Sequence, residues 1–253
     1  MKKNNETQKL GCLTGLFKRH HFTSAIILVG GSSTRYGGDM PKQFLSLDSL
    51  PVAAQSLLAF ERCDLIDEIV VVCRQGDEDH YRQMAKELSV TKLSQVVIGG
   101  STRQESALNG VTATAEASKY VLIHDGARPL VTDKIIRDVT LAAHANRAAC
   151  AATPSKDTVK IADEKGNILR TEDRNYVYLA ATPQGFYKTL YEACAHAAKK
   201  EGFDVTDDAS LLEHFYYKVK LVDCGSENIK ITTPSDLVLA EALLQKRKQR
   251  SQD

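Results

Sequence analysis

The sequence predicts an α/β fold, in which a mostly parallel β-sheet is covered by helices on both faces. Short apolar runs rich in β-branched residues alternate with longer stretches whose apolar residues recur at helical spacing. The apolar runs are almost continuous, which is typical of parallel strands buried on both faces. A hairpin-like segment interrupts the alternation after Pro154, so we also expect an inserted β-hairpin arm.

Strands and helices alternate through the first part of the chain. The strands are expected at residues 24–29, 68–73, 95–98, 120–124 and 148–153. Each intervening stretch begins with polar residues suited to helix capping. The helices are expected at residues 52–62, 77–88, 104–114 and 132–146. This order indicates a Rossmann-like sheet, in which ligands bind at the carboxyl ends of the strands, so the loops after the first, third and fourth strands are the expected functional region.

The second part of the chain is less regular. Apolar runs at 158–161 and 168–171 flank a polar turn and predict the two strands of the arm. Further elements are expected as a helix near 186–199, a capped helix from about Thr206, a strand at 218–223 and a final helix from Pro234. We therefore expect one domain over 23–246 with an arm at about 154–178, between flexible ends at 1–22 and 247–253.

Composition and charge narrow the class of protein. Lys and Arg number 33 and Asp and Glu number 32, for a net charge of +1, so no global basic field is available to bind nucleic acid. The six cysteines form no C-x-x-C pair, which argues against a zinc site and a disulfide framework and favours the cytoplasm. The start of the chain is basic but too weakly apolar for a signal peptide or a membrane span. It is expected to be a flexible extension, or else to make a weak contact with a membrane surface or a partner.

A glycine-rich loop follows the first predicted strand. Gly30, Gly31 and Ser32 are small enough for backbone N–H groups to approach a triphosphate, and Arg35 and Lys42 add two cations. The loop has neither the Walker A pattern nor the glycine spacing of a dinucleotide site. Alone it fits a plain turn as well as a phosphate site. The adjoining Pro-Lys-Gln-Phe at 41–44 favours the phosphate site.

Five further motifs lie in order along the chain. They are HDGARP at 124–129, DTVK at 157–160, Arg174 followed by TPQ at 182–184, TDDAS at 206–210 and NIKIT at 228–232. With the glycine-rich loop they resemble the 2-C-methyl-D-erythritol 4-phosphate cytidylyltransferase family, from about residue 24 to residue 244. Departures from the family pattern are Gly126, Ala181 and Ser101, and the last puts a ribose contact in doubt.

The resemblance implies an activity, a metal and an assembly. A phosphate oxygen of 2-C-methyl-D-erythritol 4-phosphate would attack the α-phosphorus of CTP, forming 4-diphosphocytidyl-2-C-methyl-D-erythritol and pyrophosphate in the non-mevalonate isoprenoid pathway. Mg²⁺ is the implied cofactor, and positioning and charge neutralisation would supply most of the catalysis without a general base. The arm would form a homodimer and reach the partner's acceptor site. The alternative is an arm that folds back onto its own core.

The resemblance also assigns roles to individual residues. Arg35, Lys42 and Lys230 are the expected catalytic residues. The expected nucleotide ligands are Gly30, Gly31, Ser32, Gly100, Ser101, Ser106 and Asp125, of which Asp125 would also bind the metal. The expected acceptor ligands are Asp125, Arg128, Thr158, Arg174, Thr182, Thr206 and Lys230.

Each assignment has a plainer alternative. The plainer role of Asp125 is to cap a turn, that of Arg128 and Lys230 is to be surface charges, and that of residues 99–106 is to form a turn with a helix cap. The family motifs favour the functional roles. His124 is expected to be a packed strand residue. For the whole protein the alternatives are a ribitol-5-phosphate cytidylyltransferase and a nucleotide-binding regulatory protein without turnover.

Overall fold

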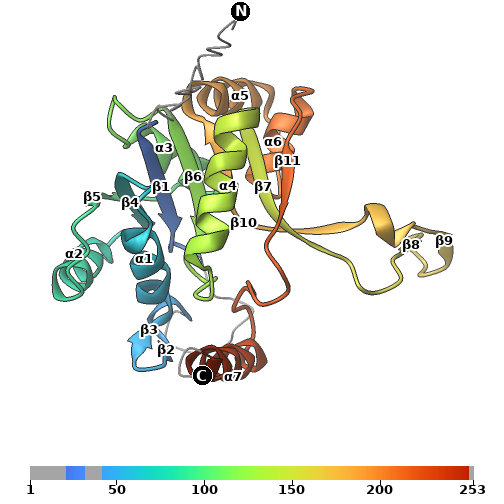
Figure 1. Cartoon of the computed structure of the whole chain (residues 1–253). Coiled ribbons are helices and arrows are strands. Elements are labelled where there is room, and N and C mark those ends of the chain that lie inside the picture. The colour runs from blue at the N-terminus through green and yellow to red at the C-terminus, as the bar shows by residue number, and fades with distance from the viewer. Residues whose placement is uncertain (1–20, 32–41, 251–253) are drawn as a thin grey trace, which may run out of the picture.

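A seven-stranded sheet forms the centre of the computed structural model, which describes residues 21–31 and 42–250 (Figure 1). The strands of this sheet are β1 (Thr23–Leu28), β4 (Glu68–Cys73), β5 (Leu93–Ile98), β6 (Tyr120–Asp125), β7 (Ala148–Pro154), β10 (Tyr178–Tyr187) and β11 (Lys220–Asp223). Their order across the sheet is β11-β7-β10-β6-β1-β4-β5. All their pairings are parallel except those of β10, which runs antiparallel to β6 and β7. The predicted mostly parallel sheet is confirmed.

Burial on both faces explains the continuous apolar runs. In β1, Ile26 packs into one hydrophobic cluster, whereas Ala25 and Ile27 pack into another on the opposite face. All three side chains are fully buried. Successive strand residues point to opposite faces, so a strand covered on both sides is apolar over most of its length.

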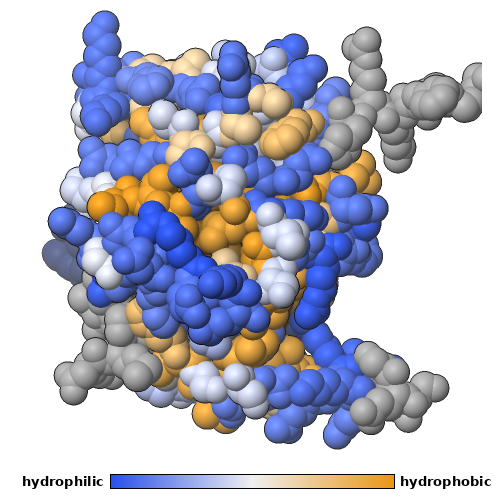
Figure 2. Space-filling model, turned by 90° about the vertical axis from the view of Figure 1, so that its left-hand side faces the viewer, coloured by the Kyte–Doolittle hydropathy of each residue, from blue (hydrophilic) through white to orange (hydrophobic). Residues whose placement is uncertain are grey.

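Helices cover both faces, as predicted. One face carries α1 (Val52–Arg62), α2 (Glu78–Glu87) and α4 (Asp133–Asn146). The other face carries α3 (Arg103–Thr112), α5 (Lys188–Glu201) and α6 (Asp208–His214). At the outer edge β5 exposes Ser94 and Gln95, polar residues that discourage pairing with another chain. Seen from this side, hydrophobic residues gather near the middle of a largely hydrophilic surface (Figure 2).

Strand β10 is the strand of the central sheet that the sequence prediction missed. The helix expected near 186–199 begins only at Lys188, because residues up to Tyr187 belong to β10. Ala180 pairs with Ala152 and Gln184 with Cys150, so β10 has two more residues than β7 over this stretch. This irregularity accommodates Pro183, which cannot donate a ladder hydrogen bond and made the segment resemble a loop.

The inserted hairpin forms as predicted. Strand β8 (Lys160–Ala162) pairs with β9 (Ile168–Thr171), and the Asp163 carboxylate accepts hydrogen bonds across the turn from the backbone N–H groups of Lys165 and Asn167. A short 3-10 helix, η2 (Arg174–Tyr176), leads back toward β10. The hairpin stands away from the sheet (Figure 1), which contradicts the alternative of an arm folded onto its own core.

A smaller group of elements lies beyond the carboxyl end of β1. It consists of η1 (Lys42–Phe44), β2 (Ser46–Leu47), β3 (Leu50–Pro51) and α7 (Pro234–Arg250) (Figure 1). Helix α7 continues past residue 246, the expected end of the domain, and Arg247 donates hydrogen bonds to the Glu227 carboxylate and to the Leu130 carbonyl at 3.1 and 2.8 Å. Residues 247–250 are therefore helical. Among the described helices, none has the length and apolarity needed to cross a membrane.

Candidate functional site

The two ends of the glycine-rich loop are held together at the carboxyl end of β1. The Gln43 side-chain amide is buried and donates to the carbonyls of Val29 and Gly31. Arg74 Nε donates to the Gly30 carbonyl at 3.1 Å. A Cβ atom on Gly30 would lie 3.3 Å from the Cys73 backbone, so the close approach to β4 favours glycine. These contacts fix where the loop leaves and rejoins the body of the protein.

Part of the predicted triphosphate site lies outside the described residues. Ser32 and Arg35 fall in the segment 32–41, and the side chain of Lys42 also lies outside the description. Their proposed contacts with the triphosphate therefore stay predictions. The structure does place Gly30 and Gly31 beside the end of β6, since β1 and β6 are neighbours in the sheet.

Three cations surround the Asp125 carboxylate at the end of β6. Lys230 Nζ lies 2.7 Å from Asp125 Oδ2, and the Arg103 Nε and Nη2 atoms each lie 3.4 Å from Oδ1. Arg128 Nε is 3.9 Å from Oδ2. Arg103 begins α3, Arg128 follows β6, and Lys230 precedes α7, so three segments far apart in the chain converge on one carboxylate.

The charges around Asp125 control its protonation. Burial acts to raise the pKa of this carboxyl, but Arg103, Lys230 and Arg128 hold the pKa well below its usual range. Burial lowers the pKa of the Arg128 guanidinium. A second carboxylate, Asp208, lies 2.7 Å from Arg103 Nη1. Three cations thus face two carboxylates, and the excess positive charge suits a phosphorylated ligand.

Thr182 lies on β10, next to Asp125 on the neighbouring strand β6. Its Oγ1 accepts a hydrogen bond from the Asp125 backbone N–H at 3.0 Å and lies 3.1 Å from His124 Nδ1. Only 3% of Thr182 is exposed. The hydroxyl contacts protein groups, and its expected contact with the acceptor stays a prediction. Thr182 therefore positions Asp125 and His124 within this structure.

His124 is the packed strand residue that the sequence predicted. It is fully buried, and burial lowers its pKa to about 3. Since Thr182 Oγ1 accepts from Asp125, its hydroxyl proton can be donated to His124 Nδ1, which leaves Nε2–H to donate to the Arg128 carbonyl at 3.3 Å. His124 is thus neutral and supports the loop that carries Arg128.

Asn228 joins the Arg128 loop to β10. Arg128 Nη1 donates to the Asn228 carbonyl and Asn228 Nδ2 donates to the Thr182 carbonyl, both at 2.8 Å. Within the described part of the chain, the buried Arg128 Nε has no hydrogen-bond acceptor. A buried donor without an acceptor is uncommon in folded proteins. Arg128 is thus held by its Nη1 contact, and its Nε–H is an unused donor at the site.

The expected cytidine loop joins β5 to α3. Ser106 Oγ accepts from the Gly100 N–H at 3.0 Å, and the Glu105 carboxylate accepts from the Ser101 N–H and hydroxyl. Thr102 caps α3 by accepting from the Glu105 N–H. A Cβ atom on Gly100 would lie 2.2 Å from Glu105, so only glycine fits this approach. Gly100, Ser101 and Ser106 lie together as predicted, in the capped turn that was the plainer alternative.

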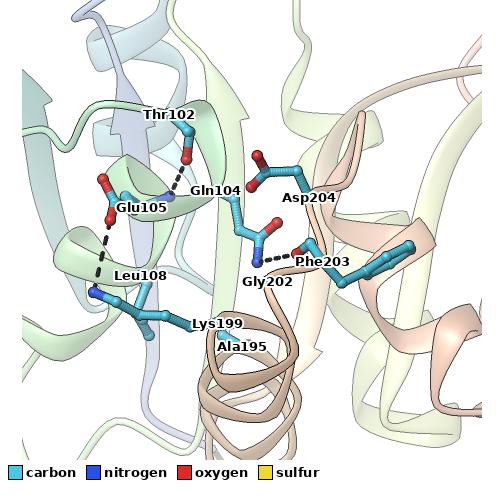
Figure 3. Close-up of a pocket in the computed structure, with 9 residues that line it drawn as sticks. All are labelled: Thr102, Gln104, Glu105, Leu108, Ala195, Lys199, Gly202, Phe203 and Asp204. Atoms are coloured by element: carbon cyan, nitrogen blue, oxygen red, sulfur yellow. Dashed lines mark hydrogen bonds and ion pairs between the residues drawn. The ribbon is translucent and has the colours of Figure 1, made fainter.

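A small pocket lies between the start of α3 and the end of α5 (Figure 3). It has a volume of about 220 Å³. Gln104, Glu105 and Lys199 are among the residues that line it, and an ion pair of 3.6 Å joins Lys199 to Glu105. Gln104 Nε2 donates to the Phe203 carbonyl at 3.4 Å across the pocket (Figure 3). The hydrogen bond across the pocket attaches the start of α3 to Phe203, in the segment that leads to α6.

The predicted acceptor residues are divided between the body and the arm. Thr206 is exposed beside α6 and lines a groove of about 430 Å³ with Tyr176 and Tyr178 from the base of the arm. Thr158 and Arg174 are exposed on the arm, and Arg174 Nη1 donates to the Lys156 carbonyl at 3.4 Å. The arm stands apart from the carboxyl end of β6, which carries Asp125 (Figure 1). The structure thus brings Asp125, Arg128 and Lys230 together but not Thr158 or Arg174.

Arg103 and Asp208 are site residues that the sequence prediction missed. Both lie inside motifs singled out there, at 99–106 and 206–210, but no role was given to either. Arg103 had one usable signal. A cation at the first position of a helix opposes the helix dipole, so its presence there suggests a carboxylate nearby.

The donor set at Asp125 fits Mg²⁺ that arrives with a phosphorylated substrate. Carboxylate oxygen is a ligand that Mg²⁺ prefers, and the metal is often held by one or two carboxylates plus substrate phosphates. Among residues 21–31 and 42–250, no group of three or more His, Cys, Asp or Glu side chains could hold a metal. The described residues therefore fit a shared metal site and not a cage made wholly by protein.

Comparison with known proteins gives one family. Residues 23–246 match the family model IspD, described as 2-C-methyl-D-erythritol 4-phosphate cytidylyltransferase. A curated protein of that name from Syntrophus aciditrophicus is 41% identical over 227 residues, covering 89% of this chain and 97% of the relative. Another from Caldanaerobacter subterraneus is 42% identical over 224 residues, covering 88% and 99%. The crystal structure of 4-diphosphocytidyl-2C-methyl-D-erythritol synthase from Anaerococcus prevotii has a TM-score of 0.81 and 36% identity, covering 89% of this chain and 97% of that one.

Proposed function

Because the chain belongs to the 2-C-methyl-D-erythritol 4-phosphate cytidylyltransferase family, we propose that it catalyses the reaction for which the family is named. It transfers the cytidylyl group of CTP to 2-C-methyl-D-erythritol 4-phosphate. The products are 4-diphosphocytidyl-2-C-methyl-D-erythritol, an isoprenoid precursor, and pyrophosphate. The observation that carries this proposal is the convergence of Lys230, Arg103 and Arg128 on Asp125, beside the start of the glycine-rich loop.

The reaction needs little chemistry from protein side chains. The phosphate monoester of the acceptor is already ionised at neutral pH and attacks the α-phosphorus directly. Pyrophosphate leaves as the new phosphoanhydride bond forms. Alignment of the two substrates and neutralisation of their charges therefore supply most of the rate enhancement. No described residue has to accept a proton in this step.

We assign the charged residues to the two substrates. Arg35 and Lys42 bind the triphosphate, with Gly30, Gly31 and Ser32 donating backbone N–H groups. Arg128, Lys230 and Thr206 bind the acceptor phosphate and its polyol. Gly100, Ser101 and Ser106 form the cytidine side of the site. Asp125 would hold Mg²⁺, which would neutralise charge on the triphosphate when bound.

The proposed assembly is a homodimer joined by the arms. Exposed Ile168 and Leu169 support this assignment, since an isolated two-stranded hairpin is marginally stable and these side chains are 63% and 65% exposed. Thr158 and Arg174 would then complete the acceptor site of the other subunit.

A cytoplasmic location is proposed as well, because the five described cysteines are unbonded thiols, as expected in a reducing compartment.

The direct test is pyrophosphate release from purified protein with CTP and Mg²⁺. Methylerythritol phosphate and ribitol 5-phosphate are compared as acceptors, and we expect turnover with the first. Preference for ribitol 5-phosphate would replace the proposed acceptor. Absence of turnover with either, despite CTP binding, would favour a regulatory protein.

The base is tested in the same assay with UTP. Cytosine N4 donates a hydrogen bond where uracil O4 can only accept one, so a site built around that donor leaves a buried acceptor unpaired when uracil binds. We expect CTP to be strongly preferred. Equal kcat/KM values for CTP and UTP would contradict the cytidylyl assignment.

A further inference from the structure

Arg103 joins two carboxylates that belong to different parts of the site. Its Nη1 atom lies 2.7 Å from Asp208 Oδ2, and its Nε and Nη2 atoms lie 3.4 Å from Asp125 Oδ1. The guanidinium is planar and has five donors, so one side chain can bond two carboxylates in fixed directions. A lysine at this position has a single ammonium group and could not reproduce both sets of contacts.

Asp208 depends on Arg103 for its charge balance. Only 1% of Asp208 is exposed, and its second oxygen accepts a hydrogen bond from the Tyr191 hydroxyl at 2.8 Å. Burial acts to lower the pKa of Arg103, but Asp208 and Asp125 raise it overall. Removal of one member of a buried ion pair leaves an uncompensated charge. The guanidinium is therefore fixed to the first turn of α6.

Gln104 makes a second connection next to the first. The Val205 N–H donates to Gln104 Oε1 at 3.1 Å, and Gln104 Nε2 donates to the Phe203 carbonyl (Figure 3). The start of α3 thus holds the segment 203–208 through two consecutive side chains. That segment carries Thr206, which we assign to the acceptor, and the turn before α3 carries the expected cytidine loop.

We propose that Arg103 is a positioning residue that couples the nucleotide side of the site to the acceptor side. The proposal rests on the proposed function. Arg103 holds Asp125 and the first turn of α6 in one arrangement relative to the turn before α3. A nucleotide that binds and stabilises this turn therefore also stabilises Asp125 and the segment 203–208 in the arrangement to which the acceptor binds. By linkage the acceptor favours nucleotide binding by the same factor.

The experiment measures that factor directly. The dissociation constant of methylerythritol phosphate is determined by calorimetry, with Mg²⁺, in the absence and presence of a CTP analogue whose α,β-bridging oxygen is replaced by methylene. In the wild-type protein the analogue should tighten acceptor binding by about tenfold, within the range usual for coupled sites. The coupling is the ratio of the acceptor dissociation constant without the analogue to that with the analogue. In Arg103→Met this ratio should fall to about one, and in Arg103→Lys it should stay well below the wild-type value.

Two further variants separate positioning from folding. Asp208→Asn keeps the volume of the side chain and an acceptor for Tyr191 but removes the charge that fixes Arg103, so it should also lower the ratio. Arg82→Met removes an exposed ion pair with Asp79 on α2, which contacts neither side of the site, and should leave the ratio unchanged. Partial unfolding would instead raise the ratio of acceptor dissociation constants without and with the analogue, because nucleotide binding would refold part of the protein. A lowered ratio therefore does not arise from loss of folding.

The outcomes are distinct from those of the activity assay. A wild-type ratio near one, or an Arg103→Met protein that keeps the wild-type ratio, would overturn the coupling role while pyrophosphate release still supports the proposed function. Absence of pyrophosphate release with every acceptor tested would contradict both the proposed function and this inference. A lowered ratio in both the Arg103 and Asp208 variants, with Arg82→Met unchanged, would establish the coupling.

Discussion

At the scale of single residues, burial and charge determine the state of each group in the site. Asp125 is only 8% exposed and stays ionised because three cations lie beside it. His124, the preceding residue, is fully buried and neutral because burial lowers its pKa to about 3. Adjacent residues on one strand thus differ because their side chains point to opposite faces of the sheet.

Arg35 and Lys42 carry the first residue-scale prediction. Arg35→Ala and Lys42→Ala should each reduce kcat by orders of magnitude, because loss of one donor to a charged transition state usually costs about 2 to 4 kcal/mol. Pyrophosphate release checks this. Arg82→Ala serves as the control, since Arg82 forms an exposed ion pair with Asp79 on α2. Near-normal turnover in either loop variant would contradict its assignment to the triphosphate.

His124 predicts a pH dependence of stability. Its pKa of about 3 in the folded protein lies below the usual value of about 6.5, so the unfolded chain binds this proton more readily. The stabilisation is fully present above about pH 6.5 and is lost as the pH falls toward 3, at up to about 1.4 kcal/mol per pH unit.

Urea unfolding at pH 7, 6 and 5 measures this slope. His124→Gln should be less stable at pH 7, because it loses the ring contacts, but should lose less stability on acidification than the wild type. His196→Gln removes an exposed histidine and should retain the wild-type slope. Identical slopes in His124→Gln and the wild type would show that another group titrates.

At the scale of elements, β10 organises the acceptor side of the site. It runs against its neighbours, and the irregular pairing between Ala180 and Gln184 places Thr182 behind Asp125. The Gln184 side chain then bonds Asp207 and Ala209 at the start of α6. Strand β10 therefore supports both β6, which carries Asp125, and α6, which carries Asp208.

Thr182→Val should test this support. Valine has nearly the same shape but no hydroxyl, so the Asp125 N–H and His124 Nδ1 each lose a buried partner, which costs about 1 to 3 kcal/mol of unfolding free energy per group. Thr182→Ser keeps the hydroxyl and should be much less destabilised. Urea unfolding gives both values. Equal stability of the Val and Ser variants would show that the hydroxyl bonds are unimportant.

At the scale of the whole molecule, the body and the arm divide the predicted site. The carboxyl end of the sheet brings together residues from the turns after β1, β5 and β6 and from the segment before α7. Thr158 and Arg174 lie instead on the projecting arm (Figure 1). Shared sites in a two-fold dimer would explain why a single chain separates these residues.

Subunit mixing tests the shared site. Lys42→Ala and Arg174→Ala proteins, each inactive, are mixed under conditions that exchange subunits. Random pairing makes about half of the dimers mixed, each with one intact and one doubly altered site, so about a quarter of wild-type activity should return. Proven exchange without recovered activity would place Arg174 in the site of its own subunit or in no site.

Local sequence was sufficient for much of the fold and for the loops of the site. Apolar runs such as 68–73 predicted buried strands, and the glycine-rich loop and the motif at 124–129 pointed to the carboxyl ends of β1 and β6, because these features depend on neighbours in the chain. Pro183 and Gly185 weakened the strand pattern of β10, so this element was missed.

The tertiary structure alone decided which charges meet. Arg103 contacts Asp125, 22 residues away, and Asp208, 105 residues away, and Lys230 is likewise 105 residues from Asp125. No periodicity or local motif encodes such pairs, because they depend on which strands become neighbours and on how the irregular β10 orients the groups beside it. The sequence by itself thus determined the kinds of element and the end of the sheet at which the candidate site lies. Packing of distant segments determined the partners of each side chain, and therefore which residues support Asp125.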